Sequence, residues 1–445
     1  MVIPAQYIQP LQTVGIVYWG RSGTLLLHSL LDSHPDILSC NAYFWLYSSQ
    51  MDQFLASEHG NCPEKLLEFI CEAFPYLFEH WPTFFPEMFR GKNRDLRFGT
   101  DRTKFISFFR EYLSYFPQGT PFCGLPSGQT IHSFVLQAIH VAYAMAQGQT
   151  LNSQNPTIVW QTHFWQADYF RERFPNIRIL SAVRHPLKGY DAWQLRGFVD
   201  ERVPPFWFYH TVKFRQMIEF MKVPSDLADR CRAIRFEDIH NRTEEAMRAL
   251  ASWLKIRWND CLLKSTFDGE PYWGVKGGCW HMLRVGEVAP VEALVTGTRK
   301  FDETKMELKY LGFIDRLRMK TFCEEAFENW HYDLASKNRP LKTLLRRYRS
   351  LLLLLPSKLD RRCFREDLRL ELKKLPRQAL LRKSRVLAKS FVDFIRNKQQ
   401  FRNEMMDLKR MQSEWKNISP VYTPNLRLGT EAGHHTDRWQ AHKAA

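Results

Sequence analysis

Residues 20–24 (GRSGT), near the start of the chain, combine groups that bind phosphates in proteins. Glycine lets the backbone approach an anion closely, Arg21 supplies a fixed positive fork, and Ser22 and Thr24 supply hydroxyl donors. A β-branched and aromatic run over residues 14–18 precedes this turn, and leucines at helical spacing follow it. Free backbone N–H groups and the positive end of the helix dipole meet at such a turn. The turn therefore predicts an anion site.

Two other interpretations of the same turn stay open at this point. It also fits an ordinary strand-to-helix connection with an arginine at the surface. Residues 15–22 in addition fit the pattern G-x-x-x-x-G-K-[ST], with Arg21 in place of lysine. That pattern keeps an ATP-dependent phosphotransferase among the possible functions.

His163 and Arg184 are further candidates because each directly follows a predicted strand. The strands are expected at residues 157–162, 178–183 and 233–236, with helical segments between them. Strands that alternate with helices indicate a parallel α/β sheet, whose ligands bind at the carboxyl ends of the strands. We therefore expect the turn, His163 and Arg184 to converge on one cleft.

The segment GRSGTLLLHSLLDSHPDI resembles the 5'-phosphosulfate loop of sulfotransferases that use 3'-phosphoadenosine-5'-phosphosulfate (PAPS). That loop usually reads P-[RK]-S-G-T-T, followed by an apolar helix and His-Pro-Asp. The loop residues that match are Arg21, Ser22, Gly23 and Thr24. Gly20 replaces the proline and Leu25 the second threonine, so one hydroxyl contact to the phosphate is missing.

Two later segments extend the resemblance. Residues 161–163 (QTH) are similar to the K-T-H element whose histidine is the general base, which implies this role for His163. The segment IRILSAVRHPLKGYDAW is similar to the one that holds the 3'-phosphate, with Arg184 as its ligand. Gln161 stands where the family has a lysine, and Ala192 where it has a serine.

The resemblance also implies how the rest of the nucleotide is held. Phe236 corresponds to the aromatic residue near the adenine, and Phe267 to the phenylalanine that stacks on it, although a core position explains Phe267 equally well. Residues 274–280 (GVKGGCW) look like a shortened lid over the 3'-phosphate, with Lys276 and Gly277 as phosphate ligands.

Together these matches imply transfer of a sulfonyl group from PAPS to a hydroxyl or amine of an unknown acceptor, such as a carbohydrate, a lipid or a small metabolite. His163 removes the acceptor proton, and Arg21 stabilises charge on the leaving phosphate without a metal. The departures at Leu25, Gln161 and Ala192 keep a second interpretation open. In it, the fold has lost catalysis and serves as a module that binds a polyanion or a membrane surface.

The sequence predicts an α/β fold with a P-loop-type parallel sheet flanked by helices. Residues 1–335 are expected to form the sulfotransferase-like domain, with a helical insertion on the acceptor side at about 40–150. Residues 336–420 carry 24 Lys and Arg against 8 Asp and Glu, and predict a basic helical extension. Residues 421–445 predict a disordered polar tail.

The expected binding partners follow from the basic extension. Its helices can contact an anionic membrane surface or a polyanion, or pair with a second copy of the chain, while no specific nucleic acid recognition is predicted. No secretory signal is visible, and no stretch reaches the about 18 apolar residues of a membrane span. Nine scattered cysteines without metal-ligand spacing favour a reduced, cytoplasmic chain, and the basic helices allow a peripheral position at a membrane surface.

Overall fold

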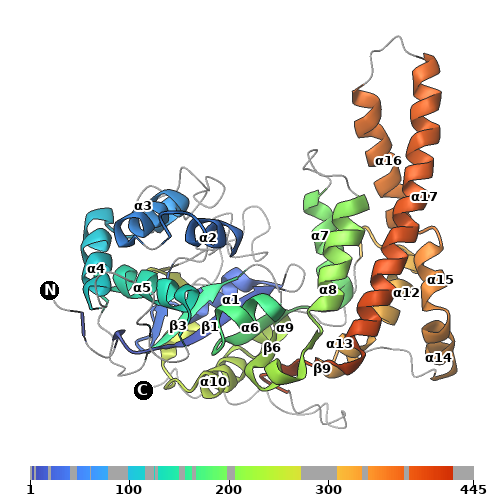
Figure 1. Cartoon of the computed structure of the whole chain (residues 1–445). Helices are drawn as coiled ribbons and strands as arrows, with labels where there is room; N and C mark the ends of the chain where they lie inside the picture. Colours follow the sequence, from blue (N-terminus) through green and yellow to red (C-terminus); the bar gives the residue numbers. More distant parts are fainter. Residues whose placement is uncertain are drawn as a thin grey trace, which may run out of the picture.

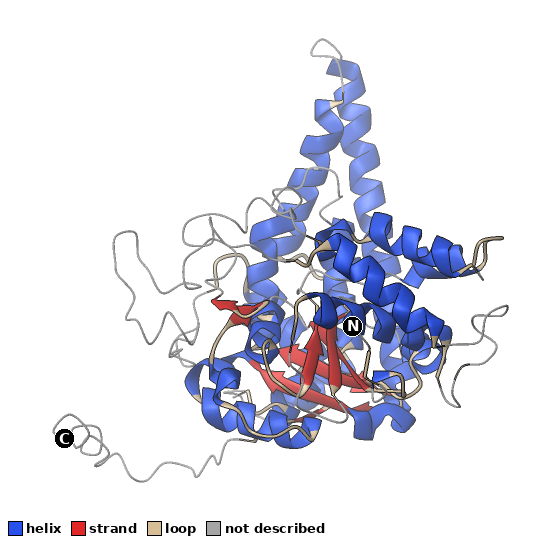
Figure 2. Cartoon of the chain, turned by 90° about the vertical axis from the view of Figure 1, so that its left-hand side faces the viewer, coloured by secondary structure: helices blue, strands red, loops and turns tan. Residues whose placement is uncertain are grey.

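Six parallel strands at the centre of the computed structural model pair in the order β10-β6-β4-β1-β3-β2 (Figure 2). Their bounds are β1 Gln12–Tyr18, β2 Ile37–Ser39, β3 Thr157–Gln161, β4 Arg178–Val183, β6 Cys231–Arg235 and β10 Ser419–Pro420. Every pair in this sheet is parallel, which confirms the predicted α/β class. The strand order puts β1, the strand before the glycine turn, between β3 and β4.

The structure describes residues 3–4, 7–18, 22–40, 48–60, 62–78, 99–115, 125, 129–149, 156–162, 167–197, 206–271, 308–332, 339–374 and 380–423. Four of the predicted site residues, namely Arg21, His163, Lys276 and Gly277, lie outside these ranges.

Both faces of the sheet are buried, which explains why its strands are almost continuously apolar. In β4, Leu180 and Ala182 face one hydrophobic cluster, while Ile179 and Val183 face the other. The leucines of α1 (Thr24–Leu31) and the apolar side of α10 (Thr243–Leu254) complete the first cluster. Helix α5 (Ile131–Ala146) completes the second, with most of its side chains buried.

The predicted helical insertion lies between β2 and β3, and its described residues include four α-helices (Figure 1). They are α2 Ser48–Leu55, α3 Pro63–Ala73, α4 Arg102–Ser114 and α5. The Asp101 carboxylate accepts a hydrogen bond from the Lys104 backbone N–H and so caps α4. A Thr130–Ser133 capping box starts α5 in the same way.

The remaining helices of the sheet domain follow β3, β4 and β6. Their bounds are α6 Ala167–Arg173, α7 Pro186–Gly197, the π-helical η5 Trp207–Phe214, α8 Arg215–Glu219, α9 Phe236–Asn241, α12 Phe313–Phe322 and α13 Glu324–Asn329. The sequence predicts one helix over 305–330, but the structure has two, separated at Cys323.

The C-terminal helices are α14 Arg339–Arg347, α15 Arg349–Leu354, α16 Lys358–Lys373 and α17 Leu380–Met411. Helices α16 and α17 project from the body as a hairpin (Figure 1). The sequence predicts separate helices at 378–395 and 405–415, but α17 runs through both. No proline or glycine interrupts the stretch between them, and its Lys398 and Phe401 side chains pack inward.

After α17 the chain returns to the sheet. β9 (Lys416–Asn417) pairs with β5 (Lys222–Val223), and β10 forms the edge of the main sheet next to β6. Residues of the predicted 336–420 extension thus complete the sheet of the α/β body. Residues 424–445, most of the predicted tail, lie outside the described ranges.

Candidate functional site

The carboxyl ends of four neighbouring strands lie at one edge of the sheet, and three of them carry described residues of the predicted site. Arg184 follows β4 directly, and Phe236 follows β6 directly. Ser22 comes a few residues after the end of β1, at the start of α1. β3 ends at Gln161, two residues before His163. The described backbone therefore leads from all four strands toward the same edge, as expected for a ligand site in a parallel sheet.

Gly23 is the N-cap of α1 and has a left-handed backbone, with φ of 78° and ψ of 32°. As a glycine, this N-cap has no side chain to cap the helix, and the carbonyl of Gly23 accepts the hydrogen bond from Leu27 N–H at 3.0 Å. A side chain is excluded here, since a Cβ atom on Gly23 would lie 2.4 Å from Cδ2 of Phe236. The helix start thus needs glycine for its conformation and for the ring packed against it.

The Phe236 ring connects this helix start to Arg184. The Arg184 guanidinium carbon lies 4.9 Å from the centroid of the Phe236 ring, and the His240 ring packs against Phe236 at 4.4 Å. Gly23, Phe236 and Arg184 come from three different strand ends, yet they form one contiguous cluster. The cluster joins an anion-binding helix N-terminus to a guanidinium.

Burial lowers the pKa of Arg184, and the nearby charge of Glu237 opposes this effect. An arginine remains a cation under these conditions because its ordinary pKa is so high. A largely desolvated guanidinium is most stable beside an anion. The site therefore favours a bound phosphate or sulfate near Arg184.

Glu237 has a structural role in this cluster. Its carboxylate accepts hydrogen bonds from the His185 backbone N–H at 3.0 Å and from the Tyr332 hydroxyl at 2.8 Å. The Tyr332 ring in turn lies 4.5 Å from the Arg235 guanidinium carbon. Sequence analysis missed Tyr332, and no local pattern marks it, because its partners lie about a hundred residues earlier in the chain. These bonds fix the turn that carries Arg184.

Gln161 and Thr162 hold the end of β3 against its neighbours. The Gln161 side-chain amide donates to the Thr24 carbonyl at 3.4 Å, and the Thr162 N–H donates to the Ile16 carbonyl at 3.0 Å. Gln161 is buried. The glutamine that replaces the family's lysine is thus engaged with the first turn of α1.

Phe267 lies behind α1 in the core. Its ring is 1% exposed and meets the His28 ring edge-on at a centroid distance of 5.9 Å. Burial lowers the pKa of His28 to about 3, so this imidazole is neutral. The surroundings of Phe267 favour the core interpretation, and its stacking on adenine stays a prediction.

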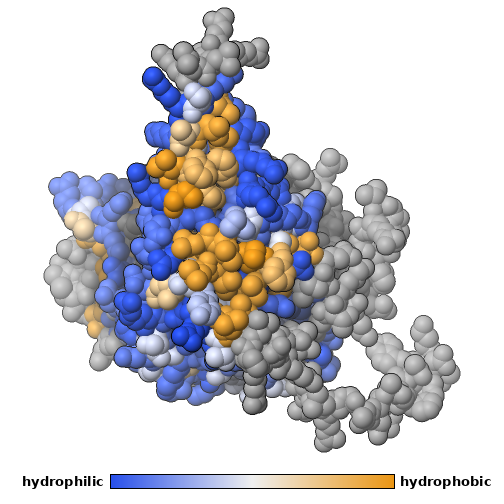
Figure 3. All heavy atoms as spheres, turned by 90° about the vertical axis from the view of Figure 1, so that its right-hand side faces the viewer, coloured by the Kyte–Doolittle hydropathy of each residue, from blue (hydrophilic) through white to orange (hydrophobic). Residues whose placement is uncertain are grey.

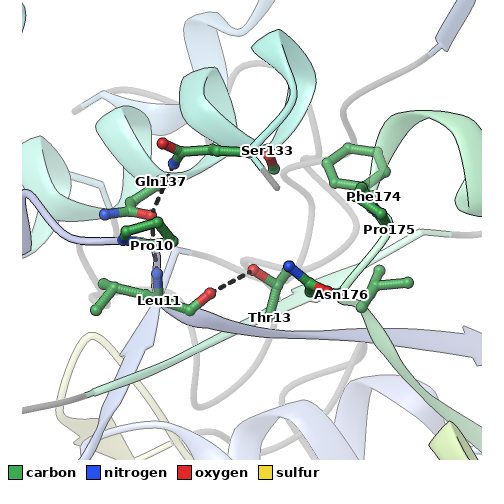
Figure 4. A pocket seen from close by; sticks show the side chains of 10 residues that line it. Pro10, Leu11, Thr13, Ser133, Gln137, Phe174, Pro175 and Asn176 are labelled. Carbon is green, nitrogen blue, oxygen red and sulfur yellow. Dashed lines mark hydrogen bonds between the residues drawn. The ribbon is translucent and has the colours of Figure 1, made fainter. Parts of the chain in front are cut away.

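A small hollow lies at the opposite edge of the sheet (Figure 4). Thr13 near the start of β1 and Ile177 just before β4 line it, together with Gln137 of α5. The Gln137 amide oxygen accepts a hydrogen bond from the Leu11 N–H at 3.1 Å. Because these are amino-terminal strand ends, the hollow is not part of the candidate site. Among the residues that the structure describes, no His, Cys, Asp or Glu cluster could hold a metal.

Residues 14–260 match the model of the sulfotransferase family. Among solved structures, the sulfotransferase domain of the olefin synthase from Synechococcus PCC 7002 is 16% identical, with a TM-score of 0.33, over 73% of this chain and 96% of that one. Sulfotransferase STF9 from Mycobacterium avium is 14% identical, with a TM-score of 0.28, over 58% and 68%. Both TM-scores are too low to support an inference about this chain. No curated protein sequence matches it significantly.

Proposed function

Because this chain belongs to the sulfotransferase family, we propose that it moves a sulfonyl group from PAPS to a hydroxyl or amine of an acceptor. The observation that carries the proposal is the Gly23–Phe236–Arg184 cluster at the carboxyl edge of the sheet. It combines a helix N-terminus with a largely buried guanidinium. The helix start and Arg184 could each bind one of two separate anionic groups of the same nucleotide.

The residues present fit such a donor. The backbone N–H groups that begin α1 have no partner within the helix, and the N-cap Gly23 places no side chain over them. Ser22, Gly23 and Thr24 would hold the 5'-phosphosulfate there, with Arg21, and Arg184 would hold the 3'-phosphate. Lys276 and Gly277 are proposed to close over that phosphate. PAPS, when bound, supplies the sulfonyl group and its phosphate leaving group.

His163 is the proposed general base, and its proton transfer needs a pKa near neutrality and hydrogen-bond reach of the acceptor. Arg21 is proposed to stabilise the charge that develops on the leaving phosphate oxygen. Phe236 acts in this proposal by packing on Gly23 and under Arg184, so it shapes the nucleotide site. No metal is assigned a role, because arginine and backbone amides supply the positive charge.

His163→Ala tests the catalytic half of the proposal. We expect this variant to lose measurable transfer of labelled sulfonyl groups to simple phenols and amines. It should keep its thermal stabilisation by PAPS, because the histidine is not proposed to bind the nucleotide. His240→Ala is a matched control, since His240 contacts Phe236 but is given no catalytic role. Transfer at the wild-type rate by His163→Ala would exclude this histidine as the base.

A specific observation favours a second candidate, a sulfotransferase fold that binds ligands without turnover. The buried Gln161 amide donates to the Thr24 carbonyl, so the position of the family's lysine carries no charge. In this case PAPS would stabilise the protein, but no acceptor would be sulfonated. Gln161→Lys would then be the variant that gains activity.

A reducing, cytoplasmic location is also part of the proposal. The seven cysteines in the part of the chain that the structure describes form no disulfide. Free thiols persist in reducing compartments.

A further inference from the structure

The C-terminal helices expose large apolar side chains that the catalytic body does not cover. Figure 3 views the molecule from the side of α14, α15 and α17 and shows apolar surface on the hairpin and on the base below it. Six side chains, between 45% and 56% exposed, define what we call the apolar strip. They are Leu344, Tyr348, Leu351, Leu387, Phe391 and Ile395.

Helical spacing places these side chains on common faces. Leu387, Phe391 and Ile395 recur every four residues along α17, so they lie one above another. Leu344 of α14, Tyr348 at the junction and Leu351 of α15 are spaced by four and three residues, which are also helical spacings. Helices α15 and α17 contact each other, which brings the two rows to one part of the molecule.

The charge around the apolar strip is strongly positive. Lys383 lies one turn before Leu387 on the same face of α17, and the exposed Arg347 directly precedes Tyr348, with its guanidinium carbon 5.8 Å from the centroid of that ring. Neither of these two cations forms an ion pair with another described residue. The acids of this region are mostly engaged elsewhere, since Asp360 is buried among cations and Glu371 pairs with Lys374.

We propose that the apolar strip docks the protein on an anionic lipid surface. The apolar side chains would enter the boundary between headgroups and acyl chains, while the cations contact anionic headgroups. No helix among the described residues is long and apolar enough to cross a membrane, so the contact is interfacial. The proposal is independent of the sulfonyl transfer assigned to the sheet edge.

A second copy of the chain fits this surface less well. A symmetric pair would bring two copies of this basic surface, each with Lys383 and Arg347, to one interface. Like charges brought together at an interface oppose association. A lipid surface that carries negative charge is complementary both to the cations and to the apolar side chains.

Vesicle flotation of the full-length protein tests the proposal, with phosphatidylcholine alone and with added phosphatidylglycerol. The apolar variant is Leu351→Ser with Phe391→Ser, and its control is Tyr115→Ser, since Tyr115 is 40% exposed on a distant helix end. The charge variant is Lys383→Gln with Arg347→Gln. Its control changes Lys104 and Lys264 on the sheet domain to glutamine.

We expect the wild-type protein to float only with the anionic vesicles. The apolar variant should bind vesicles roughly tenfold more weakly or worse, because the loss of one large apolar side chain from the lipid alone lowers the affinity by about that factor. The charge variant should also weaken binding, and both controls should bind as wild type. All substitutions are at exposed positions, and unchanged melting temperatures would verify that the variants fold.

Three outcomes would overturn the proposal. Equal binding to neutral and anionic vesicles would remove the role of charge. If the apolar variant binds vesicles as the wild type does, and a soluble polyanion displaces the protein from them, the surface is a polyanion site and not a lipid-docking site. A wild-type dimer in sedimentation that the apolar variant converts to a monomer would assign the strip to a second copy.

Discussion

At the scale of single residues, the candidate site depends on close contacts between residues from different strand ends. Gly23 has a left-handed backbone, and Phe236 covers the space where its side chain would be. Phe236 also lies beneath the Arg184 guanidinium. The sequence around each of these residues gives no indication that it contacts the other two. The predicted strand ends indicate that the three residues lie at one edge of the sheet, but only the structure shows that they contact one another.

Gly23→Ala tests this contact through stability. The left-handed backbone alone should cost about 1–2 kcal/mol of unfolding free energy, and the clash with the Phe236 ring adds to it. In a Phe236→Ala background the clash is absent, so Gly23→Ala should cost only the backbone part. Urea unfolding of the four proteins measures this coupling. Equal effects of Gly23→Ala in both backgrounds would contradict the packing described.

Asp268 gives a second residue-scale prediction. Burial and the neighbouring charge of Asp32 raise the pKa of Asp268 to about 7, and its carboxylate accepts hydrogen bonds from the Tyr143 hydroxyl and the Gly99 N–H. Because this folded pKa exceeds the unfolded value of about 4, the folded state binds more protons between the two values. Stability from this group is present below about pH 4 and is lost as the pH rises through 7.

Asp268→Asn should remove that part of the pH dependence. We expect the variant to gain on the order of 1–3 kcal/mol relative to wild type between pH 5 and pH 8. Asparagine tolerates the positive φ of 51° at this position. Urea midpoints at the two pH values measure the difference. Parallel pH profiles of the two proteins would show that the carboxyl group titrates normally.

At the scale of elements, a buried ion cluster fixes the hairpin to the catalytic body. Asp360 of α16 lies 2.9 Å from His210 Nε2 of η5, 2.8 Å from Arg318 Nη2 of α12 and 2.7 Å from Lys398 Nζ of α17. Burial alone would raise the pKa of Asp360, but the hydrogen bond from His210 and the charge of Arg318 hold it well below its usual range. One carboxylate therefore joins four elements.

Asp360→Asn should destabilise the protein by about 3–5 kcal/mol, because it leaves buried cations without their partner. Glu371→Gln on the same helix is the control, since the exposed Glu371–Lys374 pair should contribute less than about 1 kcal/mol. Chemical unfolding of both variants measures this. The depressed pKa also means that the Asp360 contribution is present above about pH 4 and declines below it. Similar effects of the two substitutions would contradict the assigned role.

Helices and strands differ in how well the sequence predicts them. β1, β3 and β4 are largely apolar runs before turn residues, and the sequence predicts a helix over residues 243–254, which are the observed bounds of α10. The three-residue β2 and the two-residue β9 and β10 carry too few residues for a recognisable pattern. Their pairing depends on partners distant in the sequence, such as β6 for β10.

At the scale of the whole molecule, the chain leaves the sheet for the C-terminal helices and then returns to it. The Trp330 indole N–H donates to the Ile418 carbonyl at 2.9 Å, and β10 extends the sheet beyond β6. The basic helices can be recognised from charge and leucine spacing, but their return to the sheet cannot. Removing residues 336–445 would therefore also remove an edge of the catalytic body.

Two truncations test this connection. A chain that ends at Thr423 keeps all described contacts and should melt as the full-length protein does. A chain that ends at Glu414 loses β9, β10 and the buried Ile418, and should melt several degrees lower. Calorimetry of the two chains measures the difference. Equal melting temperatures would show that the last strands do not stabilise the sheet.

The central claim is that the sheet edge binds a nucleotide with a 3'-phosphate through Arg184. The most direct measurement is the thermal shift with 3'-phosphoadenosine-5'-phosphate compared with ADP and ATP. We predict the largest shift for the 3'-phosphorylated nucleotide, its loss in Arg184→Ala, and its retention in Arg178→Ala, which changes the arginine at the opposite end of β4. Equal shifts for the three nucleotides in the wild-type protein would contradict the claim.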